Sequence, residues 1–269
     1  MRYAFFGSPE FAAIILERLI KAGMPPALVI CNPDRPVGRK KIITSPPTKI
    51  LAEKNKILVI QPERLSLSDI EHLTSNIELF VVAAYSKILP KEIIDLPRLG
   101  TIGVHPSLLP KYRGATPIQN TLLAGEAKTG VTLFLIDEKV DHGPMLSSSK
   151  YQVASNEMYQ SLHGKLAKLS ADLLIETLPK FVKGEISSQP QNESEATYTK
   201  KFTVEDGFVN LDKDDPAMVE RMVRALNPEP GVWTIMDGAR TKLLETELTD
   251  GKLKIKVIQK SGKKPQRLK

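Results

Sequence analysis

The sequence has little cysteine, no long apolar run and no glycine-rich nucleotide motif. Its single cysteine, Cys31, excludes a disulfide framework and a cluster of thiolate metal ligands. No apolar stretch approaches the roughly 18 residues that a membrane span requires, and residues 1–6 are too short for the core of a signal peptide. We therefore expect a cytoplasmic globular protein without a membrane anchor.

A dinucleotide-binding motif is also missing. The first predicted strand, residues 3–6, ends at Gly7, where a GxGxxG motif would need three glycines. This argues against a nicotinamide or flavin dinucleotide. A helix with Phe11, Ile15 and Leu19 at helical spacing follows, and then a second strand at residues 27–31. A strand, a helix and a strand in this order predict a parallel sheet.

The composition is that of an ordinary globular protein, with 41% hydrophobic and 26% charged residues. The net charge of +7 and the pI near 9.3 favour a polyanionic partner such as RNA. A basic, proline-rich stretch at residues 32–47 follows the second strand and predicts a long functional loop. The alternative interpretation of this stretch is a flexible, solvated insertion.

The remaining pattern divides the chain into a large α/β domain and a small β domain. Further strands are predicted at residues 58–60, 77–84, 131–136 and 145–153, with helices at 117–124 and 156–181. We place the large domain at residues 1–186, a polar linker at 187–202 and the small domain at 203–269. The small domain has one amphipathic helix, with Val219, Met222, Val223 and Leu226, followed by short strands.

One His and one Asp lie at predicted strand ends flanked by turn residues. These are His105 and Asp141, and such a pair can perform general acid-base chemistry because the carboxylate orients the imidazole and stabilises its protonated form. No nucleophile accompanies them, which suits a reaction whose substrate brings its own amine. The alternative is a structural turn histidine beside a turn-initiating aspartate. We predict no metal site, because no second His or Cys lies at ligand spacing.

Successive motifs resemble those of the methionyl-tRNA formyltransferase family. They cover residues 7–12, 32–39, 84–90, 104–114, 137–143, 224–228 and 230–234, in order along nearly the whole chain. The resemblance implies a Rossmann-like formyltransferase domain followed by a C-terminal β-barrel resembling an OB fold. It also implies transfer of a formyl group from 10-formyltetrahydrofolate to the α-amine of methionyl initiator tRNA. We expect the protein to be a monomer.

The resemblance also implies roles for individual residues. His105 and Asp141 match the family's catalytic pair. The folate-binding loop is matched by Ser107, Leu108, Leu109 and Pro110, and the insertion that meets the tRNA acceptor end is matched by Arg35, Arg39, Lys40 and Lys41.

The sequence departs from the family at Gly103, where the family has a catalytic Asn. An amide there would donate to the developing oxyanion, and loss of such a donor typically costs about a hundred- to a thousandfold in rate. Our hypothesis is that a water or a neighbouring hydroxyl fills the space above Gly103.

A basic strand near the C-terminus is the second candidate for RNA binding. Lys252, Lys254 and Lys256 alternate with apolar residues, and the period of two places the three lysines on one face. The alternative is an edge strand that lysines protect from aggregation. The small domain looks short for a complete five-stranded barrel.

Three other functions stay open at this point. The first is formyl transfer to an amino sugar or another small amine, and the second is RNA or folate binding without catalysis, which Gly103 would explain. The third is hydrolysis of the formyl folate, which needs only water as acceptor.

Overall fold

The protein's structure is a computed structural model that describes residues 1–38 and 40–268. Arg39, one of the residues predicted to bind tRNA, therefore lies outside the described residues. The chain divides into two compact units, and each is described by itself. The first unit contains residues 1–113, 130–151 and 164–197, and the second contains residues 114–129, 152–163 and the chain from residue 198 onward.

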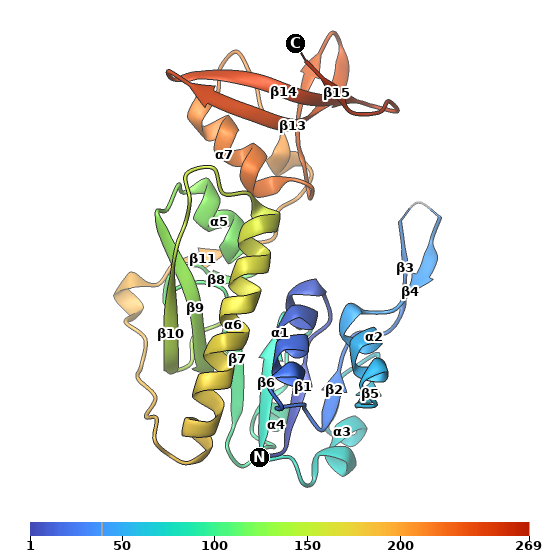
Figure 1. Ribbon diagram of the computed structural model, residues 1–269, viewed down its shortest axis with the longest axis vertical. Helices are drawn as coiled ribbons and strands as arrows, with labels where there is room; N and C mark the ends of the chain where they lie inside the picture. The colour runs from blue at the N-terminus through green and yellow to red at the C-terminus, as the bar shows by residue number, and fades with distance from the viewer. Residues whose placement is uncertain (39, 269) are drawn as a thin grey trace. The chain divides into compact units, whose positions relative to one another are not determined.

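A seven-stranded mixed sheet is the centre of the first unit, within the residues that the structure describes. In spatial order its strands are β10 (Met145–Gln152), β9 (Lys128–Leu135), β7 (Thr101–His105), β6 (Leu79–Ala83), β1 (Tyr3–Phe6), β2 (Leu28–Ile30) and β5 (Leu58–Ile60) (Figure 1). The strands from β7 to β5 are parallel to their neighbours, whereas β9 is antiparallel to β7. The prediction of a mostly parallel, Rossmann-like sheet is confirmed.

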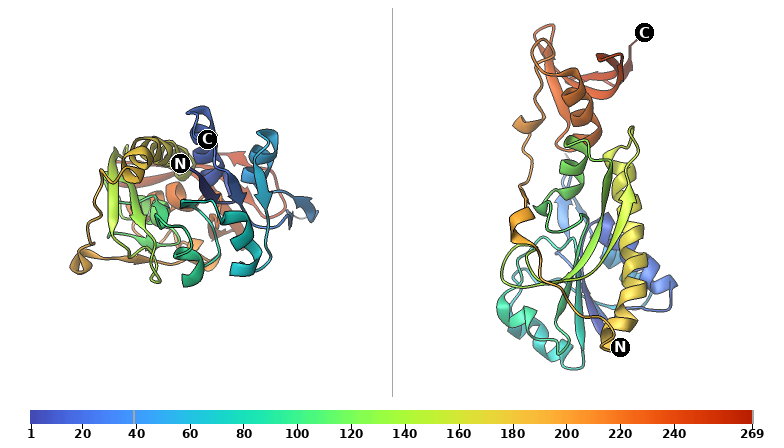
Figure 2. Two further views of the ribbon diagram at one scale, coloured as in Figure 1. Left: turned by 90° about the horizontal axis from the view of Figure 1, so that it is seen from below. Right: turned by 90° about the vertical axis from the view of Figure 1, so that its left-hand side faces the viewer.

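Helices cover both faces of this sheet. They are α1 (Glu10–Lys21), α2 (Pro47–Lys54), α3 (Leu67–Thr74), α4 (Lys91–Ile94) and most of α6 (Tyr159–Val182). Figure 2 shows α1 on one face and α4 on the other. Every residue of β1, β6 and β7 is buried, which is why these strands read as continuous apolar runs in the sequence.

The stretch predicted as a loop at residues 32–47 contains a β-hairpin. Its strands are β3 (Arg35–Val37) and β4 (Ile42–Thr44), and all six residues are exposed. The turn between them includes Gly38 at φ 71° and Lys41 at φ 48°. The periodicity did not reveal this hairpin, because its strands have three residues each and no buried face.

A hydrogen-bonded carboxylate anchors the base of this hairpin. Asp34 Oδ2 accepts from Lys49 Nζ at 2.8 Å and from Ser45 Oγ at 3.0 Å, while Asp34 Oδ1 accepts from Gln61 Nε2 at 2.8 Å. The hydrogen bonds from Lys49 and Gln61 lower the pKa of Asp34 to about 2. The hairpin therefore projects from a fixed base.

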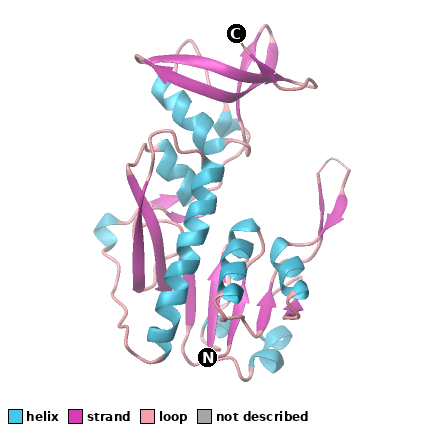
Figure 3. Cartoon of the chain, in the orientation of Figure 1, coloured by secondary structure: helices cyan, strands magenta, loops and turns pink. Residues whose placement is uncertain are grey.

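The second unit combines two helices with an antiparallel sheet. Its helices are α5 (Pro117–Leu123) and α7 (Pro216–Leu226), and its strands are β12 (Val232–Met236), β13 (Ala239–Thr249), β14 (Lys252–Lys260) and β15 (Gln266–Arg267) (Figure 3). Asp215 caps α7, because its carboxylate accepts from the backbone N–H groups of Ala217 and Met218. This unit also includes the antiparallel sheet that the sequence predicted for the small domain.

The packing of α7 follows the predicted amphipathic pattern. Val219, Val223 and Leu226 are each 1% exposed, and Met222 is 9% exposed. On the sheet, Val232 and Leu243 are fully buried. Burial of each such side chain stabilises the fold by about 1.5–3 kcal/mol. Among the described residues, no helix is both long and apolar enough to cross a membrane.

Candidate active site

The predicted catalytic residues lie at the carboxyl edge of the parallel strands. His105 is the last residue of β7, next to β6 in the sheet, and its side chain is 6% exposed. Gly7 follows β1 at the same edge, where a side chain would approach the carbonyl oxygen of Ala83 to 2.7 Å. Ligands of open α/β sheets bind at this edge.

The structure brings His105 and Asp141 together. The distance from His105 Nδ1 to Asp141 Oδ2 is 3.5 Å, slightly longer than a hydrogen bond. His105 Nε2 lies 2.8 Å from the carbonyl oxygen of Tyr112. Because a carbonyl oxygen can only accept, Nε2 carries a proton and Nδ1 faces the carboxylate. This orientation lets Nδ1 exchange a proton with Asp141 or with a bound group, since catalytic hydrogen bonds often tighten only when substrate binds.

An aromatic ring lies in the space above Gly103. A Cβ atom added to Gly103 would meet Cε1 and Cζ of Phe134 at 2.5 Å and Cγ1 of Ile136 at 3.0 Å. Gly103 and Phe134 are paired across β7 and β9, and Phe134 is 3% exposed. The hypothesis of a water or hydroxyl in this space is wrong, because the ring of Phe134 already fills it. The sequence carries no direct signal for this, because residues 103 and 134 meet only across the sheet.

The loop predicted to bind folate is held by its own hydrogen bonds. Ser107 Oγ donates to the carbonyl of Lys111 at 2.6 Å, and Thr132 Oγ1 donates to the carbonyl of Ser107 at 2.8 Å. The Leu109 N–H donates to Thr132 Oγ1 at 3.1 Å, and the Leu109–Pro110 peptide bond is cis. The side chain of Leu108 lies against Gly130 and is half-buried.

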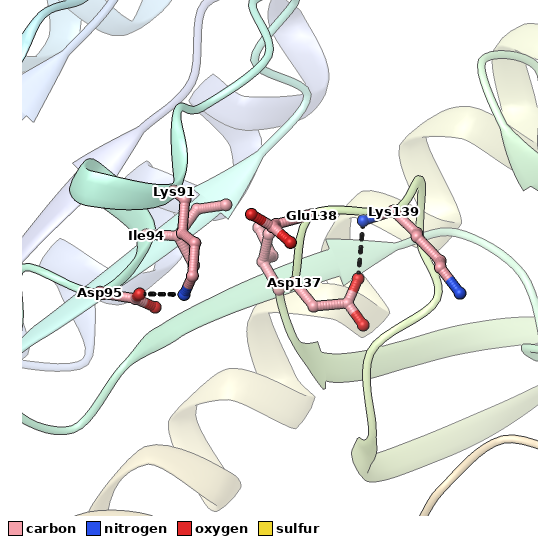
Figure 4. A pocket seen from close by; sticks show the side chains of 7 residues that line it. Lys91, Ile94, Asp95, Asp137, Glu138 and Lys139 are labelled. Atoms are coloured by element: carbon pink, nitrogen blue, oxygen red, sulfur yellow. Dashed lines mark hydrogen bonds and ion pairs between the residues drawn. The ribbon is translucent and has the colours of Figure 1, made fainter.

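A pocket of about 210 Å³ lies near the amino end of β7, where Thr101 is hydrogen-bonded to Ile94 and Ile136 (Figure 4). Its lining comes from α4 and from the segment after β9, and consists of Lys91, Ile94, Asp95, Ile136, Asp137, Glu138 and Lys139. Ile136 links the pocket to the site, since the same side chain contacts the space above Gly103. The sequence did not predict this pocket, because no distinctive spacing relates its two lining segments.

Two buried polar atoms at the same edge have no hydrogen-bond partner within the described residues. They are Asn32 Oδ1, just after β2, and the Tyr85 hydroxyl, just after β6. Burial raises the pKa of Tyr85 to about 12, so its hydroxyl stays protonated and can donate. A buried polar atom without a partner is costly, and a polar ligand would satisfy both atoms. No group of three His, Cys, Asp or Glu residues suited to a metal ion occurs in the described part of the chain.

Two further residues near the pair were not predicted. Arg113 is fully buried, and its guanidinium donates to Gln191 Oε1 and to the carboxylate of Glu193. Gln191 in turn donates to the carbonyl oxygen of Asp141. Gln191 lies in the polar stretch that the sequence predicted as a linker, where no periodicity marks a buried side chain.

The predicted RNA-binding residues lie in two places and do not meet within one unit. Arg35 forms an ion pair with Glu63, and Lys40 and Lys41 lie exposed at the hairpin turn. In the second unit Lys252 and Lys254 are exposed, whereas Lys256 forms an ion pair with Glu247. The register of β13 and β14 shifts between Glu245 and Thr246, which interrupts the simple alternation of the strand next to Lys256.

Comparison with known families gives two matches. The profile described as formyl transferase matches residues 1–178, and the profile described as formyl transferase, C-terminal domain, matches residues 201–254. The methionyl-tRNA formyltransferase of Halorhodospira halophila is 44% identical over 247 residues, which are 91% of this chain and 77% of that protein. The enzyme of the same name from Staphylococcus aureus strain MW2 is 40% identical over 248 residues, which are 91% of this chain and 79% of that protein.

Solved structures share the fold. The methionyl-tRNA formyltransferase from Clostridium thermocellum has a TM-score of 0.64 and 16% identity, covering 97% of this chain and 98% of that one. The N-formyltransferase from Helicobacter canadensis, solved with folinic acid and dTDP-3-aminofucose, has a TM-score of 0.67 and 20% identity, covering 93% and 88%.

Proposed function

The chain belongs to the methionyl-tRNA formyltransferase family, and from this premise we propose how it transfers a formyl group from a folate donor to methionyl-tRNA. Our proposal is that the donor is 10-formyltetrahydrofolate and that the acceptor is the α-amine of methionine on the initiator tRNA. The observation that carries the proposal is the pairing of His105 with Asp141 at the carboxyl edge of β7.

Acid-base chemistry by this pair accounts for the proton that the reaction moves from the amine to the leaving nitrogen. The amine nitrogen attacks the formyl carbon, and the carbonyl oxygen becomes an oxyanion. The amine loses one proton, and the nitrogen that leaves the formyl carbon gains one. His105 and Asp141 move this proton, because Nδ1 of the imidazole faces the carboxylate at 3.5 Å. The bond from carbon to the leaving nitrogen then breaks, and formylmethionyl-tRNA is released.

The oxyanion is stabilised differently from the pattern of the family. Gly103 offers no side-chain amide, and the ring of Phe134 fills the adjacent space. We assign stabilisation of the developing charge to the imidazole of His105, protonated in this step and electrostatically supported by Asp141. This makes the rate more dependent on the His105–Asp141 pair than it is in an enzyme with an additional amide.

Folate binding is assigned to the edge that surrounds this pair. The backbone of the loop Ser107, Leu108, Leu109 and Pro110 forms one side of the proposed site, and Ile136, which contacts the space above Gly103, forms another. Asn32 Oδ1 and the Tyr85 hydroxyl supply an acceptor and a donor without partners among the described residues, which fits a polar heterocycle. The proposed steps need only these groups and the His105–Asp141 pair.

tRNA binding is assigned to the exposed basic residues. We assign contacts with phosphates near the acceptor end to Lys40 and Lys41, which are exposed on the hairpin, and to Arg35 at its base. The same role is proposed for Arg39. Lys252, Lys254 and Lys256 form the second proposed contact. The domain limits at residues 186 and 203 and a monomeric state stay predictions.

The comparisons do not favour the other functions. Several proteins named methionyl-tRNA formyltransferase are 40–44% identical to the chain over 91% of its length, and this similarity favours methionyl-tRNA as the acceptor. We therefore favour transfer to methionyl-tRNA over transfer to an amino sugar and over binding without catalysis. We also favour it over hydrolysis of the formyl folate.

Formylation of charged tRNA tests the proposal directly. The purified chain is incubated with 10-formyltetrahydrofolate and methionine-charged initiator tRNA, and formylmethionine on the tRNA is followed over time. We expect formylation well above a blank without enzyme. Charged elongator methionyl-tRNA and a dTDP-amino sugar are the matched acceptors, and faster transfer to either would overturn the assignment of the initiator tRNA. Formate release without any acceptor would indicate hydrolysis.

A further inference from the structure

A polar segment of the first unit contacts the backbone on both sides of the catalytic pair. We call residues 189–197 the strap. Its first residue, Gln189, forms two backbone hydrogen bonds with Met145, of 2.7 and 2.8 Å, and this fixes one end of the strap beside β10. The strap lies inside the stretch that composition alone marks as a linker, so its contacts are a feature of the tertiary structure.

On one side the strap holds the turn that carries Asp141. Gln191 Nε2 donates to the carbonyl oxygens of Asp141 at 2.9 Å and of Gly143 at 2.8 Å. Gln191 Oε1 accepts from Arg113 Nε at 3.0 Å and from Nη2 at 2.8 Å. Arginine has no acceptor, so the oxygen of the amide must face Arg113 and its nitrogen must face the two carbonyls. The amide orientation is therefore determined.

Arg113 is itself immobilised by burial. Its side chain is 0% exposed, and the Glu193 carboxylate accepts from Nη1 at 2.9 Å and from Nη2 at 2.6 Å. The hydrogen bonds from Arg113 lower the pKa of Glu193, which keeps this carboxylate charged. A buried guanidinium deprived of these acceptors would be strongly destabilised, so Arg113 keeps Gln191 in place.

On the other side the strap holds the backbone that orients His105. Thr197 Oγ1 accepts from the Tyr112 N–H at 2.8 Å, and the Thr197 carbonyl accepts from the Arg113 N–H at 2.8 Å. The carbonyl of Tyr112 is the group that accepts from His105 Nε2 at 2.8 Å. Thr197 therefore acts on the imidazole of His105 through the backbone of one residue, Tyr112.

Both backbone positions that the strap holds are strained. Asp141 has φ 48° and Tyr112 has φ 61°, in the left-handed region that residues with side chains rarely adopt. Such conformations persist only where the surroundings hold them, and they gather at functional sites. The strap supplies hydrogen bonds to the carbonyl of Asp141 and to the N–H of Tyr112.

We propose that the strap is the positioning element of the active site, in which Gln191 and Thr197 set the separation of His105 and Asp141 without contacting substrate. This rests on the proposed function, because it assigns the strap a part in the proton transfer. A small displacement of a catalytic group, of about 1 Å, can reduce the rate as much as a hundredfold.

The main test compares two identical substitutions within the strap. Gln191→Met keeps the length of the side chain and removes both N–H donors together with the oxygen that accepts from Arg113. Gln189→Met is the control, because the Gln189 side chain is exposed and its hydrogen bonds to Met145 use the backbone. In the formylation assay we expect Gln191→Met to lower kcat about ten- to a hundredfold with little change in KM for the folate donor. Gln189→Met should match wild type.

A double substitution separates positioning from a general structural effect. Asp141→Asn removes the charge that Gln191 is proposed to position. If Gln191 acts through Asp141, then adding Gln191→Met to Asp141→Asn should lower kcat by no more than about twofold further. Fully additive losses would overturn the proposal. On the His105 side, Thr197→Val should lower kcat and Thr197→Ser should restore it, since serine keeps the accepting oxygen.

A measurement without turnover distinguishes this proposal from the proposed function. The imidazole NMR signals of the four histidines are assigned with His105→Ala and compared among wild type, Gln191→Met and Gln189→Met. We expect the His105 signal to shift in Gln191→Met alone. If the His105 signal shifts in Gln191→Met although the wild-type protein formylates no tRNA, the proposed function is refuted and the positioning role of the strap is supported. An unchanged His105 signal in Gln191→Met would refute the positioning role of the strap, whether or not the protein formylates tRNA.

Discussion

Strand β7 and the β3–β4 hairpin lie in the same compact unit, yet they present their functional residues in opposite ways. Every residue of β7 is buried, and His105 at its end is oriented by the Tyr112 carbonyl on one nitrogen and faces Asp141 with the other. Every residue of β3 and β4 is exposed, and the charges at the hairpin turn project from a base that Asp34 anchors. The difference fits the two proposed roles, because proton transfer requires fixed distances whereas phosphate binding requires exposed charge.

The largest expected effect is at the catalytic pair. His105→Ala and Asp141→Ala should each lower kcat about a hundred- to ten-thousandfold, because general acid-base catalysis contributes about that much. The affinity for tRNA should not change, since neither side chain belongs to the basic hairpin. Single-turnover formylation gives the rate, and filter binding gives the affinity. A variant that keeps half of the wild-type rate would remove that residue from the mechanism.

The next effect concerns the space above Gly103. Gly103→Asn should lower the free energy of unfolding by about 1–3 kcal/mol, because its Cβ would lie 2.5 Å from Phe134. Urea denaturation measures this change. Adding Phe134→Leu should recover part of the stability by making room for the amide.

The double variant then tests whether an oxyanion donor is missing. If the asparagine amide reaches the oxyanion, then Gly103→Asn with Phe134→Leu should formylate faster than Phe134→Leu alone. Phe134→Leu alone is the matched control, because it carries the same cavity without the amide. An equal or lower rate in the double variant would show that this enzyme does not depend on a donor at residue 103.

A smaller effect is expected at the hairpin. Replacement of both Lys40 and Lys41 by Ala should weaken tRNA binding and reduce the slope of log affinity against log salt by about 1 for each lysine–phosphate pair removed. The value of kcat at saturating tRNA should stay near wild type. Lys54→Ala with Lys183→Ala is the control, since both lysines are exposed and lie outside the proposed interface. Equal salt slopes in the two double variants would contradict tRNA binding by the hairpin.

The smallest effect is a pH dependence at the hairpin base. Hydrogen bonds from Lys49 and Gln61 lower the pKa of Asp34 from 3.8 to about 2 in the folded protein. The stabilisation is therefore fully present above pH 3.8 and disappears as the pH falls toward 2. The difference in unfolding free energy between wild type and Asp34→Asn should shrink over this range. A difference that stays constant from about pH 6 to below about 3 would contradict the assigned ion pair.

The strands and the two residues of the proposed catalytic pair could be predicted from the sequence because local patterns mark them. Residues 3–6 and 77–84 are continuous apolar runs, and parallel strands buried on both faces give that pattern. His105 stands out because it ends a short apolar run before turn-forming residues. Helix α7 is predicted by four apolar residues at helical spacing, and each of these side chains is buried.

Other parts of the site could not be predicted, since they depend on contacts between distant segments. Phe134 meets Gly103 across two strands, and Gln191 meets Asp141 across 50 positions of sequence. Arg113 belongs to a motif that the sequence displays, but only the structure shows that its charge is buried against Glu193. A single sequence contains no signal for such pairs, because spacing describes only neighbours along the chain.

The amino-acid sequence by itself determined the order of the elements, the family and the chemical identity of the pair, because apolar period, turn residues and motifs are local properties. The tertiary structure decided how near His105 stands to Asp141, what fills the space beside Gly103, and that a polar stretch holds both strained turns. These features depend on distances between segments far apart in the chain. They are set only when the strands assemble into the sheet and the strap packs beside β10.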